Sequence, residues 1–390
     1  MGGERPAGFR LTDEQVELRD AVRELARAKV APRAAEIDRE AEFPEDIRRL
    51  LATQDILALP YPEEHGGLGS DLLTVCLAIE ALSAACASTG LILAVHALGA
   101  LPIVFAGTQA QRARWLPDLA AGTKLVAFAL TEAGAGSDVA AIATRARRDG
   151  DGWVIDGSKR FISQGSVADV IVVFAVTDPE ATSQRRQLSA FVVERGTPGL
   201  SVGRVEHKMG VRGSPTAELN FDGVRVPSDH LVGAEGDGFS LAMRTFERSR
   251  PGVAAQAVGI AQGALDVATR WANERTQFGA PIGRQQMVQA LLADMDAATA
   301  AARALLYQAC AAIDAGDGDP GRWASLAKLV AGDAAMKVTT DAVQVLGGSG
   351  YLADLPVERM MRDAKVTQIY EGTQQIQRLI VARSILAAAR

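Results

Sequence analysis

The chain has 390 residues and a mass of 41.0 kDa, which is too long for one ordinary hydrophobic core and predicts two or three domains. Apolar residues make up 48% and charged residues 23%, so dominant disorder and low complexity are excluded. The net charge is −6, without a lysine- or arginine-rich block. Nucleic acid is therefore not expected as the main ligand, because phosphate binding needs a basic surface.

Cysteine and histidine are few and scattered. The 3 cysteines form no Cys-x-x-Cys motif and the 4 histidines have no ligand-type spacing, so neither a disulfide framework nor a metal site is expected. The first six residues contain no apolar signal-peptide core, and the longest apolar stretch, residues 91–106, carries His96 and Pro102. We expect a buried helix there, no membrane partner and a cytoplasmic location.

Hydrophobic periodicity changes twice along the chain. Residues 1–124 have a helical pattern that starts with a capping box at Thr12 and Gln15. Residues 125–231 contain short β-branched and aromatic runs separated by Gly, Asp and Pro, which predict an antiparallel barrel or sandwich. Residues 232–390 return to helical periodicity and predict a four-helix bundle.

The predicted fold class is α+β, mainly α, with domains at 1–124, 125–231 and 232–390. The predicted bundle helices are residues 240–275, 285–315, 321–346 and 373–389.

Two segments of the middle domain are candidate ligand contacts. Residues 128–138, FALTEAGAGSD, run from a strand into a loop of small residues whose backbone N–H groups can approach a ligand. Val139 replaces the third glycine of a dinucleotide-binding fingerprint and no Gly-Lys-Ser/Thr follows, so an ordinary tight loop stays open as the alternative. Residues 159–165, KRFISQG, place an aromatic ring and a hydroxyl on one strand, which suits either a planar ligand or a plain strand edge.

Two segments of the last domain have a similar ambiguity. Residues 275–282, RTQFGAPI, join two long helices. Arg275 can pair there with a pyrophosphate and Phe278 can cover a flat ring, or the loop is simply packed by Phe278 and Ile282. Residues 344–351, QVLGGSGY, allow either a left-handed helix cap or close backbone contact with a ligand.

The carboxylate of Glu371 is the candidate base. It stands in residues 369–378, IYEGTQQIQR, just before Thr373, which is a suitable N-cap for the last helix. A carboxylate at this place is either a solvated charge stabilised by the helix dipole or, in an apolar cleft, a base with a raised pKa. Spacing alone leaves both interpretations open.

The order of the motifs resembles that of the acyl-CoA dehydrogenase family, from about residue 10 to the C-terminus. The motifs that carry the resemblance are TEAGAGSD, KRFISQG, HKMGVRGSPT, FERSRPG, RTQFGAPI, QVLGGSGY and IYEGTQQIQRLIVAR. The last is especially similar to the short- and medium-chain type. The resemblance implies the same three domains, tightly bound FAD, a homotetramer and an electron-transferring flavoprotein as the electron acceptor.

The resemblance also implies roles for individual residues. Glu371 matches the catalytic base. Matches to FAD contacts in the middle domain are Phe128, Leu130, Thr131, Gly136, Ser137, Phe161 and Ser163. Matches to FAD contacts in the last domain, some of them toward a neighbouring subunit, are Arg275, Gln277, Phe278, Gln344, Gly347, Gly348, Thr373 and Gln375. Matches to substrate contacts are Ser137, Glu247, Arg250, Gly372 and Arg383.

Four residues depart from the family pattern. Phe161 replaces the more common Trp, which removes an indole N–H but keeps a stacking face. Ser163 replaces Thr and keeps the hydroxyl, Gln164 replaces Asn, and Ala133 replaces Pro. None of these departures removes a catalytic group.

The activity implied is FAD-dependent α,β-dehydrogenation of an acyl-CoA thioester to the trans-2-enoyl-CoA, as in fatty acid β-oxidation. Alternatives within the fold are a dehydrogenase of carrier-protein-bound acyl thioesters, an acyl-CoA oxidase and a flavin monooxygenase, although a monooxygenase does not need Glu371. The non-enzyme alternative is an inactive, flavin-free helical binding protein, against which the intact Arg275, Gln344, Thr373 and Glu371 argue. Acyl chain length and branching are not determined by the sequence.

Overall fold

The computed structural model describes residues 10–183 and 186–388, the side chain of residue 388 excepted. The chain divides into two compact units. The helical unit comprises Met1–Ala35, Asp71–Gly90 and Arg250–Arg390, and the sheet unit comprises Glu36–Ser70 and Leu91–Ser249. These two units are defined by their compactness. The three domains expected from the sequence, 1–124, 125–231 and 232–390, therefore stay predictions. The first six residues, in which no signal-peptide core is expected, lie outside the described residues. So do the beginning of the predicted segment 1–124 and the end of the predicted segment 232–390.

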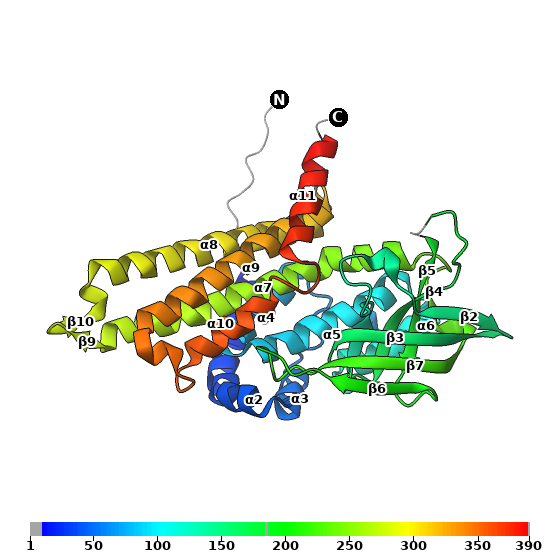
Figure 1. Cartoon of the computed structure of the whole chain (residues 1–390), viewed down its shortest axis with the longest axis horizontal. Coiled ribbons are helices and arrows are strands. Elements are labelled where there is room, and N and C mark those ends of the chain that lie inside the picture. Colours follow the sequence, from blue (N-terminus) through cyan, green and yellow to red (C-terminus); the bar gives the residue numbers. More distant parts are fainter. Residues whose placement is uncertain (1–9, 184–185, 389–390) are drawn as a thin grey trace. The chain divides into compact units, whose positions relative to one another are not determined.

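The C-terminal part of the helical unit contains the four bundle helices that periodicity predicts, and α10 in addition. α10 was not predicted; it occupies part of the stretch between the third and fourth predicted helices. A two-stranded hairpin of β9 (Thr276–Gln277) and β10 (Ala280–Pro281) separates α7 from α8. The helices, labelled in Figure 1, are α1 (Asp13–Leu25), α4 (Leu72–Ala85), α7 (Gly238–Glu274, in this unit from residue 250), α8 (Gln286–Ala315), α9 (Pro320–Leu346), α10 (Pro356–Val366) and α11 (Gln374–Ala388).

Local signals fix where the first helix begins. The amide of Gln15 donates to Thr12 Oγ1 at 3.2 Å, and the amide of Thr12 donates to Gln15 Oε1 at 3.1 Å. This is the predicted capping box, which satisfies two amide groups that a helix start otherwise leaves without partners.

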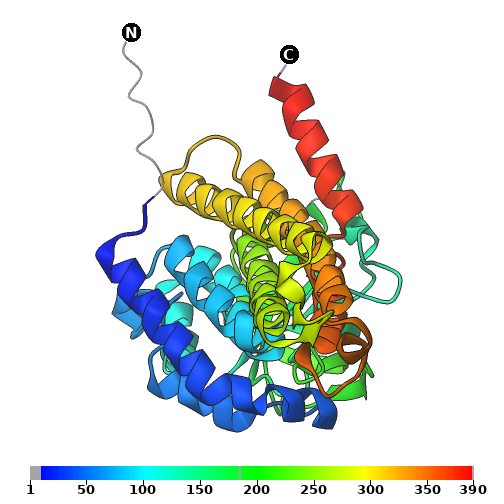
Figure 2. The ribbon, with the colours of Figure 1, turned by 90° about the vertical axis from the view of Figure 1, so that its left-hand side faces the viewer.

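A buried carboxylate joins two of these helices, and a glycine lets a third helix approach them closely. Glu80 on α4 is 3% exposed. It accepts hydrogen bonds from Arg303 Nε at 2.9 Å and from the Tyr307 hydroxyl at 3.0 Å, both on α8. A Cβ at Gly259 of α7 would lie 2.3 Å from the carbonyl oxygen of Glu80, so only glycine permits this approach of α7 to α4. Figure 2 shows α8 and α9 running alongside one another in the same unit.

The sheet unit is built around one 8-stranded sheet. Its order is β6-β7-β3-β2-β4-β5-β8, with β1 beside β4. Most pairs are antiparallel as predicted, but β1 and β2 pair with β4 in parallel. The strands are β1 (Val126–Ala129), β2 (Arg145–Asp149), β3 (Gly152–Ser163), β4 (Val170–Val176), β5 (Leu188–Glu194), β6 (Leu200–Val205), β7 (Thr216–Pro227) and β8 (Leu231–Val232).

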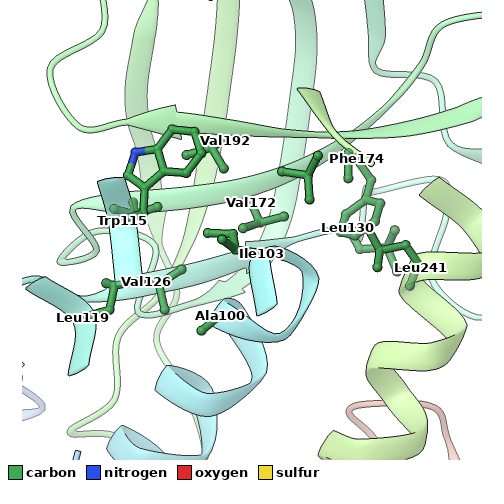
Figure 3. Packing of buried hydrophobic residues seen from close by; sticks show 14 of the residues in the cluster. Ala100, Ile103, Trp115, Leu119, Val126, Leu130, Val172, Phe174, Val192 and Leu241 are labelled. Atoms are coloured by element: carbon green, nitrogen blue, oxygen red, sulfur yellow. The ribbon is translucent and has the colours of Figure 1, made fainter. Parts of the chain in front are cut away.

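Apolar helices of this unit pack on the sheet. The unit contains α3 (Glu45–Thr53), most of α2 (Ala34–Glu40), α5 (Ala87–Ala106) from residue 91, and α6 (Gln109–Ala120). Figure 3 shows side chains of α5 and α6 meeting side chains of β1, β4 and β5. The labelled members of this cluster are Ala100, Ile103, Trp115, Leu119, Val126, Leu130, Val172, Phe174, Val192 and Leu241.

The helix α5 has the length and the apolar composition of a helix that could cross a membrane. However, 67% of its most apolar window is buried within the protein, which is typical of a core helix. His96 on this helix is fully buried, and its Nε2 lies 2.8 Å from the carbonyl oxygen of Leu119 on α6. The predicted buried helix is thus present, and His96 is a core residue.

Candidate active site

Glu371 lies in a short turn between α10 and α11. Its φ is 51°, and that of the next residue, Gly372, is 94°. A left-handed conformation at a residue other than glycine costs on the order of 1–3 kcal/mol and persists only where the surroundings impose it. Glycine is required at the second position, because a Cβ there would lie 2.7 Å from Gln377 Nε2.

Three buried side chains impose this turn. Arg250 on α7 donates from Nε to the carbonyl oxygen of Glu371 at 3.1 Å. Gln377 on α11 donates from Nε2 to the carbonyl oxygens of Glu371 at 3.1 Å and Gly372 at 2.9 Å. Lys328 on α9 donates from Nζ to the carbonyl oxygen of Gly372 at 2.8 Å. The turn is therefore held from three helices by donors that are all buried.

Tyr370, which precedes the candidate base, is also anchored. Its hydroxyl donates to Gln256 Oε1, and Gln256 Nε2 donates to the carbonyl oxygen of Ala87 at 3.0 Å. Burial raises the pKa of Tyr370, with the negative charge of Glu371 as a further cause. Tyr370 is therefore a neutral hydrogen-bond donor at physiological pH and positions the chain rather than carrying charge.

The predicted FAD contacts of the helical unit lie in different parts of it, some in the β9–β10 hairpin and the others at helix ends. Arg275, Gln277 and Phe278 are exposed in the β9–β10 hairpin, and the Phe278 side chain is 94% exposed. In Figure 1 this hairpin lies at the opposite end of α8 from the start of α11, so within one chain the hairpin is apart from the turn that precedes α11.

The other predicted contacts of this unit lie at helix ends. Gln344 is exposed in the last turn of α9, and an added Cβ at Gly347 or Gly348 would meet nothing within 4 Å. Thr373 caps α11, accepting a hydrogen bond from the amide of Ile376 at 3.4 Å. Gln375 and Arg383 are exposed on α11.

The predicted contacts of the sheet unit do come together. The amide of Arg160 on β3 donates to the carbonyl oxygen of Thr131 at 2.8 Å, so the small-residue loop lies beside the end of β3. The register between β3 and β7 shifts between Lys159 and Ile162. Phe161 lies in this β-bulge with φ 59° and a side chain that is 55% exposed. A bulge re-aims side chains, and here it presents a large aromatic face to solvent.

The remaining predicted residues differ in exposure. Phe128 is half-buried, with its ring centroid 4.9 Å from that of Phe174 and 5.7 Å from that of Phe246. Leu130 is buried in the core. Ser163 is half-buried, and Gly136 and Ser137 are exposed. Glu247 is half-buried on α7.

Sequence reasoning missed a buried ion pair under this loop. Lys159 Nζ lies 2.7 Å from Glu132 Oε1 and donates to the carbonyl oxygen of Leu130 at 3.0 Å. Glu132 also accepts from the amides of Ala143 and Thr144, at 2.7 and 3.0 Å. Burial raises the pKa of Glu132, but the Lys159 charge and the hydrogen bonds outweigh it and the pKa is lowered. Burial lowers the pKa of Lys159 to about 8.

Lys328 and Gln377 were missed as well. A signal for Lys328 exists in the sequence, since it shares the helical face of Ala324, Ala331 and Ala335, all of them buried. A lysine at a core position of an amphipathic helix indicates a buried partner. Gln377 carries no comparable signal.

Models of three consecutive domains match almost the whole chain. The acyl-CoA dehydrogenase N-terminal domain matches residues 12–123, the middle domain residues 127–224 and the C-terminal domain residues 236–386. The chain belongs to the acyl-CoA dehydrogenase family. It is thus a flavoprotein oxidoreductase of the dehydrogenase class, with the fold that its motifs predict.

Members of the acyl-CoA dehydrogenase family match over nearly their full lengths. The chain is 50% identical over 377 residues to cyclohex-1-ene-1-carbonyl-CoA dehydrogenase of Geobacter metallireducens, covering 96% of this chain and 99% of the relative. Butyryl-CoA dehydrogenase from Megasphaera elsdenii is 40% identical with a TM-score of 0.94, covering 97% and 100%. A chain described under "Electron transferring flavoprotein of Acidaminococcus fermentans: Towards a mechanism of flavin-based electron bifurcation" is 42% identical with a TM-score of 0.95, covering 97% and 100%.

The residues of the sheet unit fit the flavin that this family uses. An added Cβ at Gly134 or Gly136 would meet nothing within 4 Å, so the loop leaves open space beside its backbone. The exposed Phe161 ring offers a stacking face. Hydroxyl groups are offered by Ser163, two residues further along the chain, and by Thr131, whose carbonyl oxygen bonds the amide of Arg160. An open loop, an aromatic face and hydroxyl donors suit a planar, polar-edged ring.

Proposed function

We propose that the protein is an FAD-dependent dehydrogenase that converts acyl-CoA thioesters to trans-2-enoyl-CoA, with Glu371 as the catalytic base. The observation that carries this proposal is the turn at Glu371, whose left-handed backbone is held by Arg250, Gln377 and Lys328. Strain that the surrounding structure maintains is typical of a functional site.

The chemistry required of Glu371 is removal of the proton α to the thioester carbonyl. That C–H bond is a very weak acid, so the developing enolate needs stabilisation. The backbone N–H of Glu371 donates to the thioester oxygen in this proposal, and each such donor contributes about 3 kcal/mol. Binding of the acyl chain excludes water and raises the basicity of the carboxylate. When bound, the flavin supplies the acceptor for the hydride that leaves the β-carbon.

In this proposal, the FAD contacts of the sheet unit would be Phe128, Leu130, Thr131, Gly136 and Ser137, with Phe161 and Ser163 beside the isoalloxazine ring. Thr373 and Gln375 of the helical unit are proposed as further FAD contacts. Contacts to the FAD of a neighbouring subunit come from Arg275, Gln277, Phe278, Gln344, Gly347 and Gly348. The β9–β10 hairpin is separated from the start of α11 within one chain, which supports the assignment of Arg275, Gln277 and Phe278, because this hairpin is then available to a second copy. A homotetramer follows as the proposed assembly.

The substrate is proposed to be a CoA thioester, because the family's named relatives act on such compounds. Ser137, Glu247, Gly372 and Arg383 are the proposed substrate contacts. Arg250 was assigned with them, but its observed partner is the carbonyl oxygen of Glu371; a CoA contact by Arg250 stays a prediction. Electrons are proposed to pass to an electron-transferring flavoprotein in the cytoplasm.

The Glu371→Gln variant tests the assignment of the base. We expect it to keep flavin and to bind acyl-CoA, but to lose about 10²–10⁴-fold in the rate of flavin reduction, because that is what general-base catalysis contributes. The measurement is anaerobic bleaching of the visible flavin spectrum after addition of butyryl-CoA or longer acyl-CoAs. Glu14→Gln, at an exposed position of α1, is the control.

Each result of that experiment separates one alternative. Reduction of the Glu371→Gln variant at the wild-type rate would show that Glu371 is not the base. A yellow wild-type protein that no acyl-CoA bleaches would favour a carrier-bound substrate or different flavin chemistry. Rapid reoxidation by oxygen after bleaching would favour an oxidase, and a colourless protein that cannot be reconstituted with FAD would favour the non-enzyme alternative.

A further inference from the structure

Lys328 is a fully buried cation on α9 directly beneath the turn that carries Glu371. Its side chain is 0% exposed. Its Nζ donates to the carbonyl oxygen of Gly372 at 2.8 Å and to Gln374 Oε1 at 3.1 Å. The first acceptor lies in the turn itself and the second is the first residue of α11. A buried ammonium is costly unless its protons are satisfied, so these bonds hold this segment strongly.

The same segment has a second anchor one helical turn further along α9. Gln374 Nε2 donates to Asp333 Oδ1 at 2.9 Å and to the carbonyl oxygen of Leu329 at 2.7 Å. Gln368, on the other side of the turn, donates to the same Asp333 Oδ1 at 2.8 Å. Asp333 thus fixes the two ends of residues 368–374 on α9, and Lys328 acts on the middle of this segment.

Glycine at position 332 makes this close seating possible. An added Cβ at Gly332 would lie 3.1 Å from Gln374 Nε2 and 3.2 Å from the carbonyl oxygen of Thr367. Along α9, Lys328 therefore supplies a cation, Gly332 leaves room for the turn, and Asp333 supplies a carboxylate.

We propose that Lys328 is a positioning residue for the reaction: its ammonium, bonded to the Gly372 carbonyl and the Gln374 amide, fixes the left-handed turn that presents the Glu371 carboxylate to substrate. This inference rests on the proposed role of Glu371 as base. Lys328 acts through the backbone and does not touch the reacting atoms.

The charges around Lys328 support a protonated side chain in this role. Burial lowers the pKa of Lys328 to about 8; the nearby negative charges of Glu371 and Asp333 raise it, and the positive charge of Arg250 lowers it. The ammonium form thus still prevails at neutral pH. It faces Glu371 on the turn, Asp333 on its own helix and Arg250 on α7.

The test replaces Lys328 in the flavin-loaded, full-length enzyme. Lys328→Met keeps the length and apolar body of the side chain and removes every donor. Lys328→Gln keeps a neutral N–H donor. Lys337→Met, which removes an exposed lysine paired with Asp341 at 2.6 Å on the same helix, is the matched control.

If Lys328 is a positioning residue, its replacement should change kcat much more than KM. We expect Lys328→Met to lower kcat about 30-fold or more while KM changes less than about threefold, because a displacement of about 1 Å at a reacting group costs about 10²-fold. Lys328→Gln should recover part of kcat, and Lys337→Met should behave as wild type. Hydrogen exchange, measured without substrate, should be at least about tenfold faster in a peptide covering residues 368–377 of Lys328→Met and unchanged elsewhere.

Several outcomes would overturn the inference. Wild-type kcat and unchanged exchange in Lys328→Met would show that the ammonium does not fix the turn. A uniform rise in exchange over the whole chain would show a general stability role instead. If Lys328→Met does not fold, Lys328→Gln decides by the same two measurements. Full activity of Glu371→Gln would remove the proposed base itself, whereas an inactive Glu371→Gln beside a fully active Lys328→Met would contradict only the role of Lys328.

Discussion

Two buried lysines hold segments of the candidate site. Lys159 and Lys328 are both 0% exposed, and burial lowers the pKa of each to about 8. Each ammonium donates to backbone carbonyl oxygens of a segment assigned to the active site, Leu130 in one case and Gly372 in the other. The protein thus uses buried lysines where a turn needs a donor that no backbone amide supplies.

Burial also lowers the pKa of His96, and this affects the stability of the protein in acid. Burial lowers its pKa from 6.5 to about 4, so the unfolded chain binds a proton between these pH values and the folded protein does not. The stability contribution is fully present above pH 6.5 and is lost as the pH falls toward 4, by about 3 kcal/mol in total. We expect His96→Gln to flatten the fall in the free energy of unfolding over this range. Urea unfolding at several pH values measures it, with His207→Gln, at an exposed position, as control; an unchanged slope in His96→Gln would contradict the prediction.

At the scale of elements, the Glu132–Lys159 pair joins two neighbouring parts of the sheet unit. Glu132 binds the amides of Ala143 and Thr144 at the far end of the small-residue loop, and Lys159 lies on β3 just before the bulge at Phe161. The pair therefore fixes the loop against the strand that carries the exposed aromatic ring. Its position predicts an effect on flavin binding as well as on stability.

Removal of one partner leaves the other charge buried and unpaired. We expect Lys159→Met to lower the free energy of unfolding by about 3–5 kcal/mol and to release flavin. The double variant Glu132→Gln/Lys159→Met should recover part of the loss, because no charge is then unpaired. Urea unfolding and the ratio of flavin to protein absorbance measure both effects. Arg147→Met, which breaks an exposed pair with Asp156, should cost at most about 1 kcal/mol; an equal cost for Lys159→Met would show that the buried pair is not special.

At the scale of the whole molecule, exposed apolar side chains lie on the helical unit. Phe278 is 94%, Tyr351 83% and Leu386 65% exposed. Single exposed apolar side chains are common on protein surfaces, but Phe278 lies in the same hairpin as the exposed Arg275 and Gln277. The proposed assembly, in which one subunit contributes to the FAD site of another, would place this hairpin at a subunit contact.

This assembly predicts a coupling between oligomer and cofactor. Sedimentation should give a particle of about four times the mass of the chain. Arg275→Met should lower the flavin content and Arg270→Met, at an exposed position of α7, should not. A monomer that retains FAD at full occupancy would contradict a shared cofactor site.

The sequence by itself determined most of the helices, the β character of the middle segment, the capping box at Thr12 and the family, because these depend on local spacing and on the order of motifs. It also predicted Glu371 and Phe161 as residues of the candidate site. Only the tertiary structure decided what holds them: the left-handed turn under Arg250, Gln377 and Lys328, the β-bulge at Phe161 and the buried Glu132–Lys159 pair. The physical reason is that Arg250, Lys328 and the Glu132–Lys159 pair join residues tens of positions apart along the chain, so their contacts arise only when helices and strands pack. Gln377 is six residues from Glu371, but its side chain carries no sequence signal of its bond to the turn.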